Sequence, residues 1–182
     1  MLIREASPTD ATALARVHVD SWRTTYAGIV PAVYLANLSY AQREQFWCDI
    51  FSTPIPSRCV YVAVQDTGEI VGFASGGPER SGHALYRGEL YAIYLLASYQ
   101  RQGLGRRLTM AVVQELLQCG LSSMLVWVLA ANPGRAFYAV LGGQQVDEKE
   151  STIGTTPLRE VAYGWPDLHG LVQRLQFSDT LE

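Results

Sequence analysis

An apolar run from Leu90 to Leu96 passes directly into a basic, glycine-bearing turn, and the turn passes into a helical pattern. The run is rich in Leu, Ile and Tyr, which predicts a strand. After the turn, Leu104, Leu108 and Val112 recur four residues apart, which predicts a helix. A strand that enters a helix in this way presents unpaired backbone N–H groups and the positive end of the helix dipole. The stretch therefore predicts a phosphate-binding site, with an ordinary helix start as the alternative.

The glycines of this turn have a physical role in that prediction. Gly103 and Gly105 lack a Cβ atom, so a bulky polyanion can approach the backbone closely and the chain can adopt a positive φ. Arg101, Arg106 and Arg107 are expected to add positive charge around the turn.

Length and charge limit the classes of protein to consider. The chain has 182 residues, and we expect a single domain over residues 1–182. A net charge of −3 argues against a nucleic-acid partner and is compatible with a cationic substrate. The cysteines, Cys48, Cys59 and Cys119, are scattered, which indicates a reducing compartment and no metal-ligand spacing. Because we find no signal-peptide pattern and no apolar stretch long enough to span a membrane, we expect no membrane partner and a cytoplasmic location.

The remaining chain alternates helical and strand patterns. In order, we expect a strand at 1–4, a helix from Ser7, a helical stretch at 31–51 with a break near Ser39, a hairpin of strands at 59–64 and 70–74, a polar loop at 76–87, the strand and helix described above, a strand at 124–129, a short helix after Asn132, strands at 144–152 and 158–165, and a tail helix. This order predicts the α/β class, an α+β mixed sheet with helices on both faces. The tail is expected to pack on the body or on a partner, and an exposed sheet edge is compatible with a homodimer.

Two segments resemble the sequence pattern of the GCN5-related N-acetyltransferases, the GNAT superfamily. The segment from Gln100 to Gly105 matches the acyl-CoA-binding signature, which is Gln or Arg, two residues, Gly, one residue, and Gly or Ala. Asn132 followed by the segment from Phe137 to Gly143 resembles the second half of the family pattern. The segment from Trp22 to Pro31 is similar to a bacterial subgroup of the family whose substrates are mostly unassigned.

The resemblance implies a GNAT fold, in which a central, mostly antiparallel sheet contains one splayed parallel pair of strands. It implies that acetyl-CoA is the acetyl donor, that its pantetheine arm lies between the splayed strands, and that its diphosphate lies on backbone N–H groups of the turn. The residues that the resemblance assigns to cofactor binding are Ile93, Tyr94, Leu95, Gln100, Arg101, Gln102, Gly103, Leu104, Gly105, Arg106, Asn132 and Arg135.

The implied reaction transfers acetyl to a primary amine of a small molecule or peptide, by direct attack through a tetrahedral intermediate. Glu89 matches a glutamate that serves as the base in histone-modifying members, and a strand-edge salt bridge is the alternative for this residue. Other members use different bases or ordered water. Tyr138 is the candidate acid, with an ordinary core tyrosine as the alternative. We expect the backbone N–H of Leu95 to stabilise the oxyanion.

The sequence gives less information about the residues that bind the acceptor amine. Trp22 and Tyr26 are the predicted substrate-binding residues, although aromatic residues at helical spacing are more often core. Further candidates for the acceptor site are Tyr34 and Trp47, with Glu44 or Asp20 to bind a cationic acceptor. A second functional hypothesis is a non-catalytic acyl-CoA-binding sensor. A dinucleotide-binding enzyme is disfavoured, because no third glycine follows at the needed spacing and no βαβ unit begins the chain.

Overall fold

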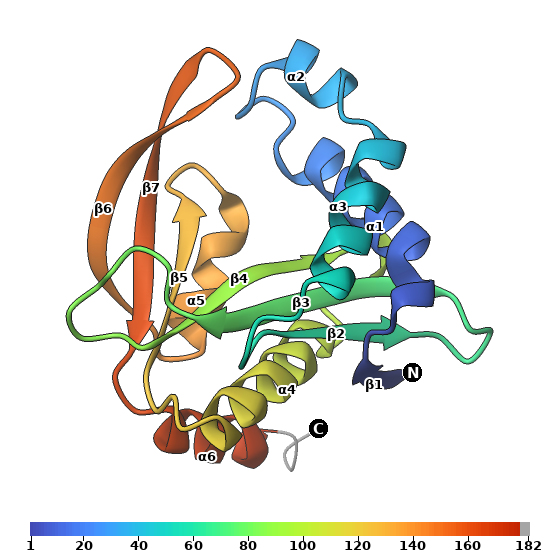
Figure 1. Cartoon of the computed structure of the whole chain (residues 1–182). Coiled ribbons are helices and arrows are strands. Elements are labelled where there is room, and N and C mark those ends of the chain that lie inside the picture. Colours follow the sequence, from blue (N-terminus) through green and yellow to red (C-terminus); the bar gives the residue numbers. More distant parts are fainter. Residues whose placement is uncertain (179–182) are drawn as a thin grey trace.

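The computed structural model describes residues 1–178, and its centre is one seven-stranded sheet (Figure 1). The strand order is β1-β2-β3-β4-β5-β7-β6. All neighbouring pairs are antiparallel except β4 and β5. The strands are β1 (Leu2–Glu5), β2 (Cys59–Val64), β3 (Ile70–Pro78), β4 (Gly88–Leu95), β5 (Met124–Leu129), β6 (Gln144–Ile153) and β7 (Thr156–Trp165).

Helices cover both faces of the sheet (Figure 1). One face packs on α1 (Ala11–Thr25) and α3 (Tyr40–Ser52), and the other on α4 (Leu104–Gln118) and α6 (Leu168–Ser178). The two shorter helices are α2 (Ala32–Ala36) and α5 (Ala136–Val140), and single 3₁₀ turns lie at Pro8–Asp10, Ala97–Tyr99 and Pro133–Arg135. The predicted α/β mixed sheet with helices on both faces is therefore confirmed.

The parallel pair in the middle of the sheet is open for most of its length. Strands β4 and β5 pair only at Gly88↔Met124 and Glu89↔Leu125. Beyond these positions β4 continues to pair with β3, and β5 with β7, but β4 and β5 no longer pair with each other. The splayed pair that the family resemblance implied is present, and we call the space between the two strands the opening.

Local chemistry determines two helix boundaries, and the first of them was predicted. The break near Ser39 is real, because the Ser39 hydroxyl accepts a hydrogen bond from the backbone N–H of Gln42 and starts α3. Helix α4 ends before Gly120, whose φ of 78° suits the position just past a helix end.

The polar loop predicted at 76–87 was wrong at its start, because β3 runs on to Pro78. Glycine is required there by close packing. A Cβ on Gly76 would lie 2.5 Å from a methyl of Val112, and a Cβ on Gly77 would lie 2.6 Å from the Tyr91 hydroxyl.

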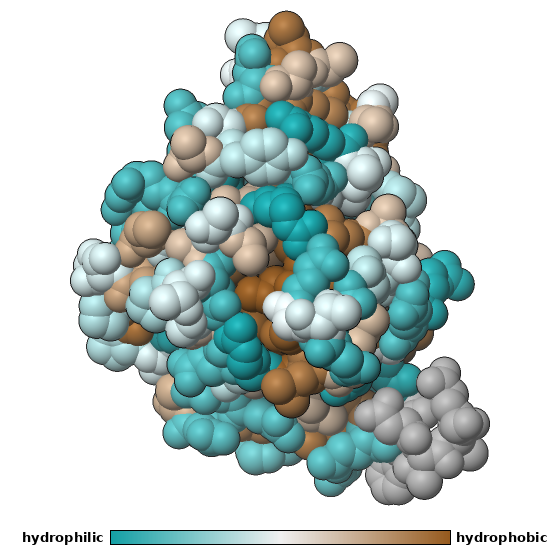
Figure 2. All heavy atoms as spheres, turned by 90° about the vertical axis from the view of Figure 1, so that its right-hand side faces the viewer, coloured by the Kyte–Doolittle hydropathy of each residue, from teal (hydrophilic) through white to brown (hydrophobic). Residues whose placement is uncertain are grey.

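The tail helix packs on the body of the same chain. Leu168, Leu171 and Leu175 of α6 are buried in the core cluster that also contains α4. The homodimer stays a prediction, and its argument from an apolar tail is weakened. Figure 2 shows a largely polar face, with apolar atoms in its middle and at its top over α2, where Val33 is 72% exposed. No helix among residues 1–178 is long and apolar enough to cross a membrane.

Candidate active site

The backbone of β4 offers hydrogen-bonding groups to the opening. The N–H of Leu96 donates to the carbonyl of Val71 on β3. Because successive residues of a strand direct their N–H groups to opposite sides, the N–H groups of Leu95 and Ile93 are directed away from β3, toward the opening. The carbonyl of Leu95 agrees with this direction, because it accepts a hydrogen bond of 3.1 Å from the side-chain amide of Gln100.

The turn that leads from β4 into α4 contains two residues with left-handed backbone conformation. Gly103, the N-cap residue of α4, has a φ of 76°, and Arg101 has a φ of 62°, which is uncommon for a residue other than glycine. No side chain caps the helix. The first backbone N–H that donates within α4 is that of Arg107, to the carbonyl of Gly103. The helix therefore presents the unpaired N–H groups and positive dipole end that bind anions.

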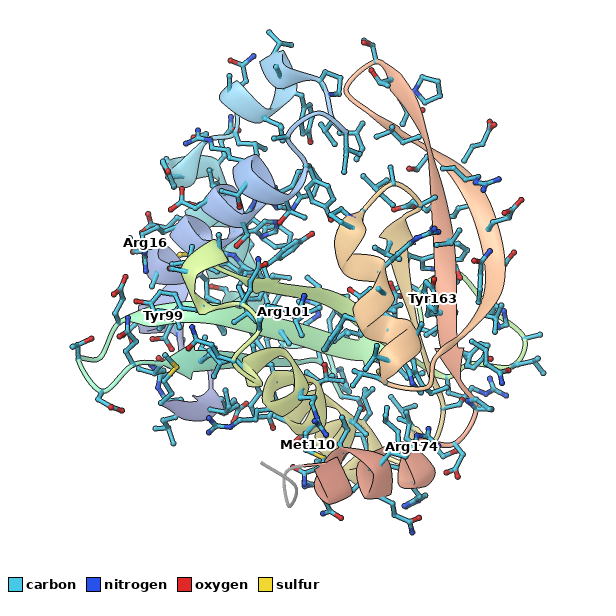
Figure 3. The ribbon with its side chains drawn as sticks, turned by 180° about the vertical axis from the view of Figure 1, so that it is seen from behind. Arg16, Tyr99, Arg101, Met110, Tyr163 and Arg174 are labelled. Atoms are coloured by element: carbon cyan, nitrogen blue, oxygen red, sulfur yellow. The ribbon has the colours of Figure 1, made fainter. Side chains whose placement is uncertain are left out.

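The three arginine side chains near this turn have different surroundings. Arg106 donates to the carbonyl of Leu175 on α6, and Arg107 donates to the carbonyl of Met1. Both guanidinium groups therefore have partners at α6 and at the N-terminus, while the backbone N–H of Arg106 remains at the turn. Arg101 lies in the turn between β4 and α4 (Figure 3), is exposed, and has no hydrogen-bond or ion-pair partner among the described residues.

The other predicted cofactor-binding residues of the turn differ in what their side chains contact. The side-chain amide of Gln102 donates to the carbonyl of Ser98 and stiffens the turn. The side chain of Leu104 is buried in the core, so only its backbone N–H can bind a ligand. A Cβ on Gly105 would lie 3.3 Å from the ring of Phe137, so glycine here lets α5 approach the first turn of α4.

Asn132 lies at the end of β5, on the other side of the opening. Its side-chain oxygen accepts from the N–H of Gly134 and so caps the helical turn expected after Asn132, and its side-chain nitrogen lies 3.5 Å from the Tyr26 hydroxyl. Arg135 follows on the exposed surface, with no ion-pair partner among residues 1–178.

Three tyrosines, two of them buried and one partly buried, lie close together at the opening. They are Tyr26 after α1, Tyr94 on β4 and Tyr138 on α5. Burial raises the pKa of each of the three hydroxyls, and their mutual proximity contributes to the higher pKa of Tyr94 and Tyr138. The ring of Tyr138 also packs against those of Tyr163 and Trp165, with centroids 5.9 and 6.4 Å away. At neutral pH all three hydroxyls therefore keep their protons.

The predicted acceptor residues Trp22 and Tyr26 contact each other edge to face, with ring centroids 4.8 Å apart. Both belong to a cluster that also includes Leu129 of β5 and Tyr94 of β4, so they span the opening. Tyr34 joins the same cluster through its ring contact with Trp22.

The other acceptor candidates have structural partners elsewhere. Trp47 is buried against Phe73 in the core under α1 and α3. The carboxylate of Glu44 accepts from the Thr12 hydroxyl, and that of Asp20 accepts from the Tyr40 hydroxyl.

Glu89 is buried and bonded to a cation that the sequence reading did not identify. The guanidinium of Arg80 donates to both carboxylate oxygens of Glu89, at 3.0 Å from Nε and 2.5 Å from Nη2, and the backbone N–H of Arg80 donates as well, at 3.2 Å. Arg80 also stacks over the ring of Tyr91, 4.0 Å from its centroid. A buried strand carboxylate requires a nearby cation, and the loop at 79–87 could have been searched for one. The salt bridge is thus present, while the catalytic role stays a prediction.

A cavity of about 260 Å³ lies beside Glu89, and its other lining residues are Arg80, Ser81, Trp127 and Lys149. Leu90 packs on the face that carries α4, so the neighbouring Glu89 side chain points to the opposite face, the one that carries α1 and α3. Sequence reasoning missed Trp127 and Lys149 as well. The signal for Trp127 was present, since it lies between Val126 and Val128 in a strand next to the opening.

Comparison with known proteins gives the family. The model of the acetyltransferase (GNAT) family matches residues 18–142. A curated relative, the uncharacterized N-acetyltransferase YuaI of Bacillus subtilis (strain 168), is 46% identical over 169 residues, which cover 93% of this chain and 95% of the relative.

Solved structures share the fold at lower identity. The PaiA N-acetyltransferase from Thermoplasma acidophilum, in complex with coenzyme A, is 23% identical with a TM-score of 0.66, over 87% of this chain and 96% of that one. The protein yncA from Salmonella typhimurium, solved with acetyl-CoA, is 21% identical with a TM-score of 0.68, over 92% of this chain and 94% of that one. The predicted family and fold are confirmed, and the chain belongs to the GNAT acetyltransferase family.

Proposed function

We propose that this protein is an N-acetyltransferase that moves acetyl from acetyl-CoA to a primary amine of a small molecule or peptide. The observation that carries the proposal is the opening between β4 and β5, which leads to the uncapped start of α4. Family members of the same fold have been solved with coenzyme A or acetyl-CoA, which supports an acyl-CoA as co-substrate.

The residues present suit an acyl-CoA. The backbone of Ile93 to Leu95 would bond the pantetheine arm as a neighbouring strand would. The N–H groups from Gln102 to Arg106 would bind the diphosphate, with Arg101 and Arg135 as free cations nearby. A single contact between a charge and a helix dipole contributes only about 0.3–1 kcal/mol, so several N–H groups must act on the same diphosphate.

The amine must lose a proton before it can attack. An alkylamine with a pKa of about 10.4 is roughly 0.1% neutral at pH 7, a deficit of about 4–5 kcal/mol. Glu89 is the proposed base. Because Arg80 occupies positions on both of its oxygens, we expect the proton to reach Glu89 through a bridging water.

The transfer then makes one C–N bond and breaks one C–S bond. The amine nitrogen attacks the thioester carbonyl, and the Leu95 N–H, which is directed into the opening, would stabilise the oxyanion. Tyr138 would protonate the departing thiolate. Its hydroxyl carries a proton at neutral pH, because burial raises its pKa.

Two measurements test the proposal. We expect calorimetry to show saturable acetyl-CoA binding, and a CoA-release assay to show turnover with at least one amine from a broad panel. Binding without turnover on any amine would favour the acyl-CoA sensor. No binding by folded protein would refute the assignment of the opening and of the turn before α4.

A further inference from the structure

The cavity beside Glu89 has a composition suited to a small ligand with two opposite charges. Its lining residues include one buried carboxylate, Glu89, and two cationic side chains, Arg80 and Lys149, with a hydroxyl from Ser81. Lys149 is the only lysine of the chain. The volume of about 260 Å³ is below the roughly 300–1,000 Å³ typical of pockets for drug-sized ligands.

The cations of this cavity keep donors that the protein does not use. Arg80 donates to Glu89 through Nε and Nη2, and none of its described side-chain bonds involves Nη1. Lys149 has its ammonium 3.9 Å from the centroid of the Trp127 ring and 3.5 Å from a carboxylate oxygen of Glu160. That separation is long for a charge-assisted hydrogen bond, so the ammonium keeps donors for a ligand.

The site therefore favours an anion next to an amine. Arg80 is paired with Glu89, and Lys149 is paired with Glu160, which does not line the cavity, so the lining itself has two cations and one carboxylate and favours an anion. A polycation, in contrast, would have to approach two positive side chains. The indole N–H of Trp127, another lining residue, is buried without a partner among the described residues.

We propose that this cavity holds the carboxylate of the acceptor, so that the acceptor is a small amino-acid-like amine rather than a polyamine. The inference rests on the proposed function. Lys149 and Arg80 bind the carboxylate of the acceptor, and its amino group lies toward Glu89 and the opening.

The kinetic test compares acceptors that differ only in the anion. L-leucine, L-phenylalanine and L-histidine are each compared with their amide and with their decarboxylated amine in a CoA-release assay. The amides have less basic amino groups and hence more neutral amine, so intrinsic reactivity works against the proposal. We expect the free acids to have the higher kcat/KM by about ten-fold or more, the range of one charged hydrogen bond.

Two variants locate the source of that preference. Lys149→Met removes the charge and keeps the chain length, and we expect it to reduce the acid-over-amide ratio by about ten-fold. Arg159→Met is the matched control. Arg159 lies on the same hairpin and pairs with Glu148, but it occupies the next register position and so faces the opposite side. It should leave the ratio unchanged.

A binding test works without turnover. Reductive ¹³C-methylation labels the two kinds of amino group in the chain, the single lysine and the N-terminal amine, and both keep their charge. The N-terminal amine pairs with Asp66 at the far edge of the sheet, so it serves as the internal control. We expect N-acetyl-L-leucine to shift the Lys149 resonance saturably, while N-acetyl-3-methylbutylamine does not.

The outcomes separate this inference from the proposed function. Turnover of amines with no preference for the acid, unchanged by Lys149→Met, overturns the carboxylate site and leaves the acetyltransferase standing. If no acceptor of the panel turns over, a saturable shift of the Lys149 resonance supports the site, and the absence of a shift overturns it.

Discussion

Replacing Arg80 by methionine removes the cation that is bonded to both carboxylate oxygens of Glu89. In the variant, the buried carboxylate keeps only the backbone N–H of residue 80 as a donor from this group. We expect the free energy of unfolding to fall, because a buried charge that has lost its partner is strongly destabilising.

The structure sets the size of that loss. Breaking a fully buried ion pair costs about 3–5 kcal/mol. The side chain of Glu89 is 5% exposed but that of Arg80 is 59% exposed, so water can replace part of the lost interaction. We therefore expect about 2 kcal/mol for Arg80→Met, and about 1 kcal/mol for Glu89→Gln, which leaves an exposed cation instead of a buried anion. In the double variant the unpaired anion is gone, so the two losses should not add, with a coupling of about 1–2 kcal/mol.

Urea unfolding followed by tryptophan fluorescence measures all three variants, and the same proteins are assayed for CoA release. If Glu89 is the base, Glu89→Gln lowers kcat by about 10²-fold or more, while Arg80→Met, which keeps the carboxylate, lowers it less. Additive stability losses, or a loss below about 0.5 kcal/mol for Arg80→Met, would refute the reasoning about the ion pair. An equal fall in activity for both variants would make Glu89 a structural residue.

Three further predictions concern the turn before α4, Tyr138 and the first helix. Gly103→Ala should destabilise the protein by about 1–2 kcal/mol from its positive φ alone, since a Cβ there meets no atom within 4 Å, and calorimetry should show weaker acetyl-CoA binding; an unchanged melting curve would contradict this. Tyr138→Phe should lower kcat about ten-fold or more with acetyl-CoA affinity within two-fold, and unchanged turnover would remove Tyr138 as the acid. Hydrogen bonds from Arg4 lower the pKa of Asp10 from its ordinary 3.8 to about 2, so the contribution of this pair to stability is nearly complete above about pH 5 and is lost progressively as the pH falls toward 2. Asp10→Asn should therefore cost about 2 kcal/mol at pH 7 and almost nothing near pH 2, as measured by denaturant titration at both values.

The sequence predicted the features that local chemistry determines. The turn with Gly103 could be recognised because a left-handed residue before a helix requires glycine, and the helix start at Asn132 because its side chain can cap the backbone. The strand order around β4 and β5 followed from the family resemblance rather than from periodicity.

The contacts that depend on the tertiary fold could not be predicted in the same way. Arg106 looked like a phosphate ligand because it follows the turn, but its side chain reaches α6, which is 69 residues away in the sequence. Arg80 and Lys149 meet at one cavity although they come from a loop and from an edge strand. No periodic pattern links such positions, so only the fold shows that they surround Glu89.

Only two residue pairs join β4 to β5, so the sheet consists of two halves that are connected at one end of these strands. One half contains β1 to β4 and the other contains β5, β7 and β6. Beyond the two joining pairs, the facing edges of β4 and β5 are not hydrogen-bonded to each other. A molecule bound in the opening would form hydrogen bonds with β4 and with β5 at the same time. Backbone amide hydrogens on the facing edges of β4 and β5 should therefore both exchange more slowly when acetyl-CoA is bound than when it is absent. Binding of the donor would thus connect the two halves of the sheet along their whole length.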